Sequence, residues 1–231
     1  MLEVTGIEKR YRGRTILKNV SFRANPGECI GIVGGNGCGK TTLLSILAGI
    51  RKPDRGSIRI DGQEALGRHR LLEEKIAYVP QENPLIPELT AFDNYRLWFR
   101  GKRREMERDL ECGVGHVLGV DRFLKTQAGR LSGGEKKRLS IAAALSGRAD
   151  ILILDEPTRG IDVGAKNEIY KLMNRLAAEG KSIIMISSEM TEVLRMSDRI
   201  IVMCEGKITG NIDISEATQE HIMNHATRNI N

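Results

Sequence analysis

The stretch GGNGCGKTT, Gly34 to Thr42, holds the residue types needed to bind an anion. Its glycines allow positive φ angles and turn backbone N–H groups inward, while Lys40 adds a positive charge. The spacing fits G-x-x-x-x-G-K-[ST], in which the lysine reaches the β- and γ-phosphates of a nucleotide and the next hydroxyl ligates Mg²⁺. A helix beginning near the lysine would add its N-terminal partial charge. The residues predicted to hold the nucleotide are Gly34, Asn36, Gly37, Cys38, Gly39, Lys40, Thr41 and Thr42, and Thr41 is also a predicted Mg²⁺ ligand.

A second stretch, ILILDEP, could supply the chemistry that a phosphate-binding loop alone lacks. Hydrolysis needs a second Mg²⁺ anchor and a group that orients water. Asp155 follows four apolar residues, at the carboxyl end of an expected strand, where it would face Mg²⁺ across the nucleotide crevice. Glu156 would polarise the attacking water. With Lys40 on the reacting phosphates, these two carboxylates predict a catalytic site for ATP hydrolysis.

Four short apolar runs are predicted to form the sheet that carries these residues: CIGIV (29–33), ILIL (151–154), SIIMIS (182–187) and RIIVM (199–203). Continuous apolarity at strand length is typical of strands buried on both faces, as in a parallel sheet. Between the second and third runs, apolar residues from Ala165 to Leu176 recur at helical spacing. This helix is expected to begin after Asp162, as N-cap, and to end at Gly180. Alternation of strands and helices predicts a doubly wound α/β core.

The remaining segments predict two additions to this core. The first 30 residues and GSIRIDG (56–62) alternate with the strand period and are expected to form antiparallel strands. Residues 88–147 have helical patterns and are expected to form a helical insertion. We therefore expect a single domain over 1–231, in which 1–87 and 148–231 form the α/β core with a β subdomain and 88–147 form a helical subdomain.

Composition places the 231-residue chain among ordinary globular proteins, with 29% charged and 40% hydrophobic residues. Its apolar runs are far shorter than the roughly 20 residues needed to cross a bilayer, and we expect a cytoplasmic protein. The net charge is +6, and the basic runs RGKRR (100–104) and KKR (136–138) are interpreted as solvated helix faces. Four cysteines without a C-x-x-C pair are expected to be reduced and mostly buried.

A third motif carries a resemblance to a known family. LSGGE, Leu131 to Glu135, resembles the signature motif of ABC ATPases and lies between the phosphate loop and ILILDEP, as it does in that family. Tyr11 upstream, Gln81 in YVPQE, and Asp162 in RGID complete the family's order of motifs. The resemblance covers essentially the whole chain and implies a P-loop NTPase (RecA-like) core with an antiparallel β subdomain and an inserted α-helical subdomain.

The resemblance also implies how the site is completed. Two nucleotide domains pair head to tail, as a homodimer or a heterodimer with a second ATPase domain. The signature residues Ser132, Gly133 and Gly134 of one domain then contact the γ-phosphate bound to the other. A hydroxyl and N–H groups at a helix start suit such an anion site.

Single residues receive roles by the same resemblance. Tyr11 would stack on adenine. Gln81 would contact Mg²⁺ or water and relay the nucleotide state to the helical insertion, which places it among both the catalytic and the metal-binding residues. Asp162 would act at the dimer interface. The implied cofactors are ATP and Mg²⁺.

One position departs from the family. A histidine usually follows the strand of the IIMI type and contacts the γ-phosphate, whereas this sequence has Ser188. A serine donates a single neutral hydrogen bond, and charge-assisted bonds are roughly twice as strong. Ser188 is therefore predicted to contribute to catalysis but, if the chain acts as a homodimer, to make hydrolysis slower than is typical of the family. The signature also ends in Glu135 where glutamine is commoner.

The carboxyl-terminal part resembles the second ATPase half of bacterial sugar importers, in DEPTRGIDVGAKNEIY, SSEMTEVLRMSDRIIVM and ATQEHIMNHAT. In those halves the phosphate loop is usually imperfect and no glutamine follows YVP, while both are intact here. The resemblance to that branch is local. It favours a sugar cargo only weakly, and the direction of transport stays open.

The favoured function is the ATPase subunit of a transporter that acts through a separate membrane permease, peripheral at the cytoplasmic face of the cell membrane. The segment ENPLIPELTAFDNYRLWF after Gln81 carries most of the aromatics, which serve either a permease dock or the core. The alternative is a soluble ABC ATPase acting on nucleic acid or ribosomes, although no nucleic acid is expected because the basic run lacks interleaved aromatics. A non-hydrolysing regulatory module is disfavoured by intact Lys40, Asp155 and Glu156.

Overall fold

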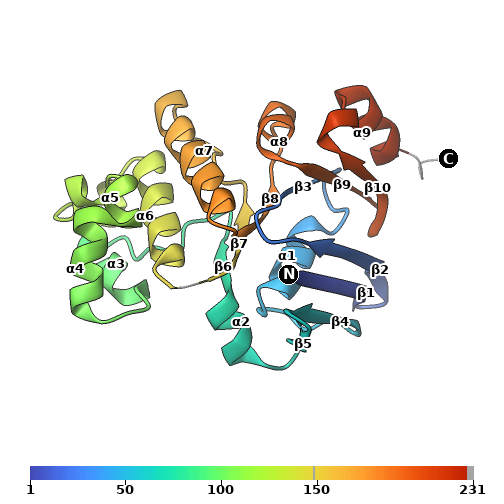
Figure 1. The fold of residues 1–231 in the computed structure, drawn as a ribbon, viewed down its shortest axis with the longest axis horizontal. Helices are drawn as coiled ribbons and strands as arrows, with labels where there is room; N and C mark the ends of the chain where they lie inside the picture. Colours follow the sequence, from blue (N-terminus) through green and yellow to red (C-terminus); the bar gives the residue numbers. More distant parts are fainter. Residues whose placement is uncertain (148, 228–231) are drawn as a thin grey trace.

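The computed structural model describes residues 1–147 and 149–227 and contains two β-sheets with helices around them (Figure 1). The larger sheet has the strand order β10-β9-β3-β8-β7-β6. Its first five members in sequence are parallel to one another, and β10 is antiparallel to β9 at one edge. The strands are β3 (Cys29–Gly34), β6 (Ile76–Val79), β7 (Ile151–Asp155), β8 (Ser182–Ile186), β9 (Arg199–Cys204) and β10 (Lys207–Asp213).

All four predicted buried strands are confirmed as β3, β7, β8 and β9. Sequence reasoning missed the two edge strands. β6 has only four residues, and β10 alternates between buried and exposed positions, so neither forms a long apolar run.

The smaller sheet is antiparallel, as predicted, with the order β2-β1-β4-β5. Arg12 and Gly13 join its first two strands and both have positive φ, 45° and 82°. Two such residues in succession match the right-handed twist of a hairpin. The strands are β1 (Leu2–Tyr11), β2 (Arg14–Ala24), β4 (Arg55–Ile60) and β5 (Gln63–Glu64).

Helices connect the strands of the larger sheet. The predicted helix is α7, whose N-cap Asp162 accepts a hydrogen bond from the Ala165 N–H, and Gly180 follows its end with φ 87°. The helices of this group are α1 (Lys40–Leu47), α2 (His69–Lys75), α7 (Val163–Ala178), α8 (Met190–Met196), α9 (Gln219–Thr227) and the 3₁₀ helix Ile214–Glu216.

Residues 88–147 lie between β6 and β7 and are helical, as predicted, beside the β6 end of the sheet (Figure 1). Thr90 caps the first of these helices by accepting a hydrogen bond from the Asp93 N–H. The elements are α3 (Ala91–Trp98), α4 (Arg103–Cys112), α5 (Val114–Val117), α6 (Gly133–Leu145) and the 3₁₀ helices Val120–Phe123 and Ala128–Arg130.

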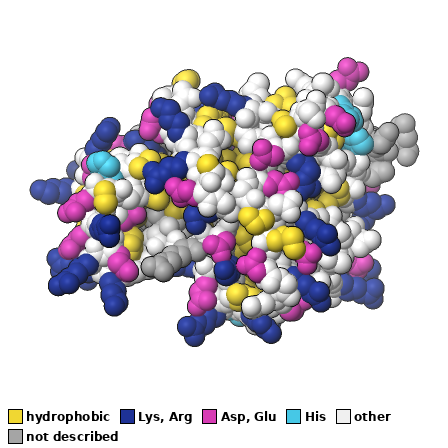
Figure 2. Space-filling model, viewed as in Figure 1, with side chains coloured by type: hydrophobic (Ala, Val, Ile, Leu, Met, Phe, Trp, Pro, Cys, Tyr) yellow, Lys and Arg dark blue, Asp and Glu magenta, His cyan; other side chains and the backbone are white. Residues whose placement is uncertain are grey.

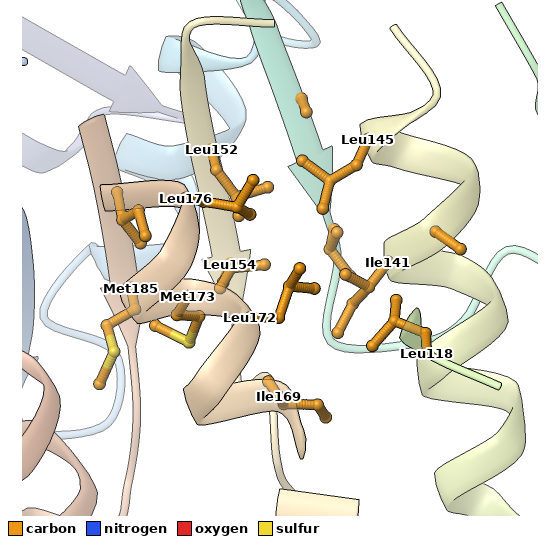
Figure 3. Packing of buried hydrophobic residues seen from close by; sticks show 14 of the residues in the cluster. Leu118, Ile141, Leu145, Leu152, Leu154, Ile169, Leu172, Met173, Leu176 and Met185 are labelled. Carbon is orange, nitrogen blue, oxygen red and sulfur yellow. The ribbon is translucent and has the colours of Figure 1, made fainter. Parts of the chain in front are cut away.

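The core lies on both faces of the larger sheet. Leu152 and Leu154 of β7 pack toward α6 and α7 with Ile141 and Leu172 (Figure 3), while the alternate residues of β7 pack with α1 and the smaller sheet. This two-sided burial explains the unbroken apolar run ILIL. The helical segment shares its core with the sheet, so its position is tied to the strands that end at the site.

The positive charge of the chain is distributed rather than gathered on the face shown in Figure 2, where Lys and Arg are interspersed with Asp and Glu. Several exposed arginines pair with a glutamate one helical turn away, such as Arg103 with Glu107 at 2.8 Å. Exposed pairs of this kind contribute about 0.3–0.5 kcal/mol each. The run RGKRR is accordingly confirmed as a largely exposed segment.

Candidate functional site

The loop from Gly34 to Thr42 joins β3 to α1, so the predicted strand–loop–helix context is present. Gly34, Gly37 and Gly39 have φ angles of 152°, 77° and 110°, which side-chain-bearing residues rarely adopt. Gly39 is the N-cap of α1 and brings no capping side chain. The first N–H groups of α1 are therefore open to a bound anion.

The Lys40 ammonium lies over this loop. Its Nζ donates hydrogen bonds to the backbone oxygens of Gly34 at 2.7 Å and Gly35 at 3.1 Å. These contacts keep the charge beside the N–H groups of the loop. A phosphate bound by the loop would lie within reach of the same ammonium.

Asp155, at the end of β7, is only 2% exposed. Burial raises its pKa above the ordinary value, and the nearby Glu156 carboxylate raises it further. The Thr41 side chain and two lysines, Lys137 and Lys40, oppose that shift. The Asp155 Oδ2 atom is buried and finds no hydrogen-bond partner within residues 1–147 and 149–227. A cation would relieve both the buried charge and the unpaired oxygen.

This donor set fits Mg²⁺. Magnesium is usually held by one or two carboxylates together with nucleotide phosphates and water. The described residues contain no cluster of three or more His, Cys, Asp or Glu side chains that would form a site by themselves. Asp155 beside Thr41 provides the sparse set of oxygens that a phosphate-bound Mg²⁺ needs.

Glu156 has a positive φ of 51°, an uncommon conformation for a residue with a side chain. Its Oε2 accepts two hydrogen bonds from Ser188, from the backbone N–H at 3.1 Å and from the hydroxyl at 3.0 Å. Ser188 follows the end of β8, the strand next to β7. The carboxylate is thus held in a defined orientation by Ser188.

These residues surround one cavity of about 450 Å³, within the size range of small-molecule sites. Arg14, Ile16, Arg159, Ile186 and Ser187 also line it and were not predicted, because no motif marks them. The predicted residues that line it are Gly34, Asn36, Gly37, Gly39, Lys40, Thr41, Thr42, Gln81, Asp155, Glu156 and Ser188.

Tyr11 and Cys38 are predicted nucleotide contacts that lie outside the described lining of this cavity. Cys38 is buried under the loop, with 7% exposure. The Tyr11 hydroxyl accepts a hydrogen bond from Arg51 at 2.7 Å, and the cationic groups of Lys9 and Arg51 lie 5.3 and 5.6 Å from its ring centre. Adenine stacking on Tyr11 therefore stays a prediction.

The signature residues also lie outside the cavity lining described here. Ser132 is the N-cap of α6, accepting a hydrogen bond from the Glu135 N–H, while the Glu135 carboxylate accepts from the Ser132 N–H and hydroxyl at 2.8 Å. Gly134 lies next to Asp162, since a Cβ added to it would be 3.6 Å from Asp162 Oδ2. The first turn of α6 and the N-cap of α7 thus form a second polar site on the same chain.

Lys137 corrects the interpretation of KKR as a solvated face, because it is only 3% exposed. Its Nζ donates to the backbone oxygens of Pro80 at 3.0 Å, Gln81 at 3.3 Å and Asp155 at 3.4 Å. Burial lowers its pKa to about 8, against the opposing effect of nearby carboxylates. The helical periodicity of α6 places Lys137 on the same side as its buried residues. The basic run nevertheless predicts an exposed segment, because lysine is rarely buried.

Comparisons with known proteins show the family to which the chain belongs. Residues 17–159 match the family model described as ABC transporter. The ribose import ATP-binding protein RbsA 2 of Rubrobacter xylanophilus is 39% identical over 98% of this chain and 46% of its own length. The galactose/methyl galactoside import ATP-binding protein MglA of Clostridium tetani is 40% identical over 91% of this chain and 45% of its own length. The chain belongs to the ABC transporter ATP-binding family and spans about half the length of these relatives.

Solved structures place the fold in the same class. A structure of an ATP-binding subunit of an ABC transporter superposes with a TM-score of 0.87 at 25% identity, covering 98% of this chain and 99% of its own. The ATP-binding cassette MJ0796, solved as a dimer in a post-hydrolysis state with ADP and Pi, gives 0.82 at 28% identity over 93% of this chain and 99% of its own. The predicted fold, a P-loop NTPase core with a β subdomain and a helical insertion, is thereby confirmed.

Proposed function

We propose that this chain binds and hydrolyses MgATP and that hydrolysis powers transport through a separate membrane permease. The observation that carries the proposal is the convergence of the loop 34–42, Gln81, Asp155, Glu156 and Ser188 on one cavity of about 450 Å³. These residues come from four distant parts of the sequence, and together they supply phosphate binding, a Mg²⁺ anchor and a base.

Each residue has a defined task in this proposal. The loop N–H groups and Lys40 would hold the β- and γ-phosphates, while Thr41, Asp155 and Gln81 would hold Mg²⁺. When bound, Mg²⁺ neutralises charge that develops on the phosphates. Glu156 orients water in line with the γ-phosphate and accepts its proton.

Ser188 is proposed to orient Glu156 and to contact the γ-phosphate. Ser188→His is expected to raise ATP turnover about two- to tenfold, because a partly protonated imidazole offers a charge-assisted hydrogen bond. Ser188→Ala, which removes the hydroxyl but keeps the backbone N–H bond to Glu156, is the matched variant and should be slower than the natural protein. Phosphate release measured for all three checks the order His, Ser, Ala, and an unchanged or lower rate for Ser188→His contradicts it.

We further propose that the site is completed by the signature of a second ATPase domain, either another copy or a different domain. The support is that Ser132, Gly133 and Gly134 present a helix start away from the lining of their own cavity, with Asp162 beside them. The dimeric structure of MJ0796 supports pairing of two ATPase domains. Tyr11 is proposed to stack on the adenine at the edge of this cavity.

Mixing two inactive variants tests the homodimeric form. Lys40→Ala removes the loop cation but keeps the signature, and Ser132→Arg blocks the signature but keeps the loop. Each is expected to be inactive alone. An equimolar mixture should recover about one quarter of the natural rate, because half of the randomly formed dimers are mixed and each mixed dimer holds one intact site out of two. Absence of recovery with both variants folded contradicts a homodimer.

The permease is proposed to dock at a second cavity, of about 500 Å³, between α1, α2 and the helical insertion. Its lining includes Leu85 and Trp98 from the aromatic segment after Gln81, and Trp98 is 47% exposed. Tyr95 of the same segment is fully buried and belongs to the core. The aromatic segment is therefore proposed to contribute both to the core, through Tyr95, and to the permease dock, through Leu85 and Trp98.

We propose the boundaries 1–87 and 148–231 for the core with its β subdomain and 88–147 for the helical subdomain. No helix in the part of the chain described here is long and apolar enough to cross a bilayer. A peripheral location at the cytoplasmic face of the membrane is proposed, and the names of the relatives support a sugar as the imported cargo.

A further inference from the structure

The Lys137 ammonium lies where three motifs meet. It extends from the second turn of α6, five residues after Ser132. It reaches the carboxyl ends of β6 and β7, neighbouring parallel strands on which Val79 pairs with Leu154. The side chain is therefore a direct connection from the signature helix to the segment carrying Gln81 and to the strand carrying Asp155.

The hydrogen bonds of Lys137 match its donor capacity. An ammonium group has three N–H donors and no acceptor. Three backbone oxygens, of Pro80, Gln81 and Asp155, lie within 3.0–3.4 Å of Nζ. Pro80 and Gln81 directly follow β6 and Asp155 is the last residue of β7, so the lysine donates to backbone oxygens at the carboxyl ends of two neighbouring strands.

No carboxylate within residues 1–147 and 149–227 forms an ion pair with Lys137, so its bonds to the three backbone oxygens define its place. A methionine side chain has a similar length but no donor. It would leave the segment after β6 free to move relative to α6. Gln81 lies in that segment, and its side chain lines the nucleotide cavity.

We propose that Lys137 is a positioning residue that fixes Gln81 and the end of β7 to the signature helix. When α6 contacts the nucleotide of a partner domain and shifts, Lys137 transmits that shift to Gln81 and Asp155, which line the chain's own nucleotide cavity. The catalytic part of this inference rests on the proposed ATPase function, whereas the mechanical part does not.

Lys137→Met is the direct test, and Lys136→Met is the matched control on the neighbouring residue, whose ammonium makes one long contact at 3.5 Å with the Gly129 oxygen. Lys137→Met is expected to lower kcat by about 10- to 100-fold, the size of effect seen when positioning groups are lost, while KM for ATP changes less than about threefold. Lys137→Gln keeps amide donors and should be intermediate. Lys136→Met should match the natural protein.

Deuterium uptake by the peptide 76–89 provides a readout that does not depend on activity. Uptake should be faster in Lys137→Met than in Lys136→Met, with the thermal transition of both recorded. Equal uptake, or a loss of kcat and of ATP affinity in equal proportion, overturns the proposal. If Lys137→Met does not fold, the same two criteria are applied to Lys137→Gln. If the natural protein hydrolyses no ATP, the proposed function fails, and uptake by the peptide still decides whether Lys137 fixes this segment.

Discussion

The Glu156→Gln variant is expected to bind MgATP with nearly natural affinity and to hydrolyse it about 10²–10⁴-fold more slowly, the range for loss of general acid–base catalysis. Glutamine has the same shape as glutamate and keeps an oxygen that can accept the two Ser188 hydrogen bonds. It cannot accept a proton from water. The measurement is single-turnover phosphate release together with equilibrium nucleotide binding.

Glu220→Gln is the matched control, because Glu220 is exposed on α9, outside the cavity lining described. It should hydrolyse ATP at the natural rate.

Glu156→Gln should also accumulate as an ATP-bound dimer, since closure of the site no longer leads to hydrolysis. Persistent turnover in Glu156→Gln would show that another group orients the water.

Gly34→Ala is expected to be the most damaging single substitution in the loop. Gly34 has φ 152°, and an added Cβ would lie 2.2 Å from the Met203 backbone oxygen and 2.8 Å from Cys38 Sγ. Backbone strain and overpacking of this kind together cost about 3 kcal/mol, which for a domain of this size lowers Tm by roughly 6–12 °C. Displacement of the loop should also lower ATP affinity at least about tenfold, because several N–H donors lose their alignment.

Gly35→Ala, one residue further on, separates steric strain from any general effect of alanine in the loop. A Cβ on Gly35 has no described atom within 4 Å. This variant should stay within about 0.5 kcal/mol of the natural stability, as is usual for substitutions that meet no obstacle. Thermal denaturation with and without ATP compares the two. Equal transitions for Gly34→Ala and the natural protein would contradict the loop geometry.

The parts of the site that could be predicted are those encoded by a local pattern. The loop from Gly34 to Thr42 needs glycines at the positions with positive φ. The spacing of the glycines along the sequence therefore predicts the backbone conformation of the loop. The end of β7 is also predictable from a local pattern. Its run of four apolar residues, which is buried on both faces of the sheet, ends at the charged residue Asp155. The helix α7 is bounded by its cap, Asp162, and by Gly180, which are also local signals.

The parts that could not be predicted depend on contacts between distant residues. The bond from Ser188 to Glu156 joins residues 32 apart, and that from Lys137 to Pro80 joins residues 57 apart. Composition even indicated the opposite for Lys137, because lysine is rarely buried unless its donors are satisfied. The acceptors of the Lys137 ammonium are backbone oxygens at the ends of β6 and β7. Their position depends on the place of β6 in the sheet, and the sequence did not predict β6.

The most direct test of the central claim is a titration of the purified protein with MgATP, followed by equilibrium binding, alongside Lys40→Ala and the exposed-site control Lys52→Ala. The account predicts saturable binding to the natural protein and to Lys52→Ala, with affinity lowered at least about tenfold in Lys40→Ala, because a desolvated phosphate loses its charge-assisted contact. Absence of binding, or equal affinity for Lys40→Ala and the natural protein, would contradict the claim that this cavity holds the nucleotide.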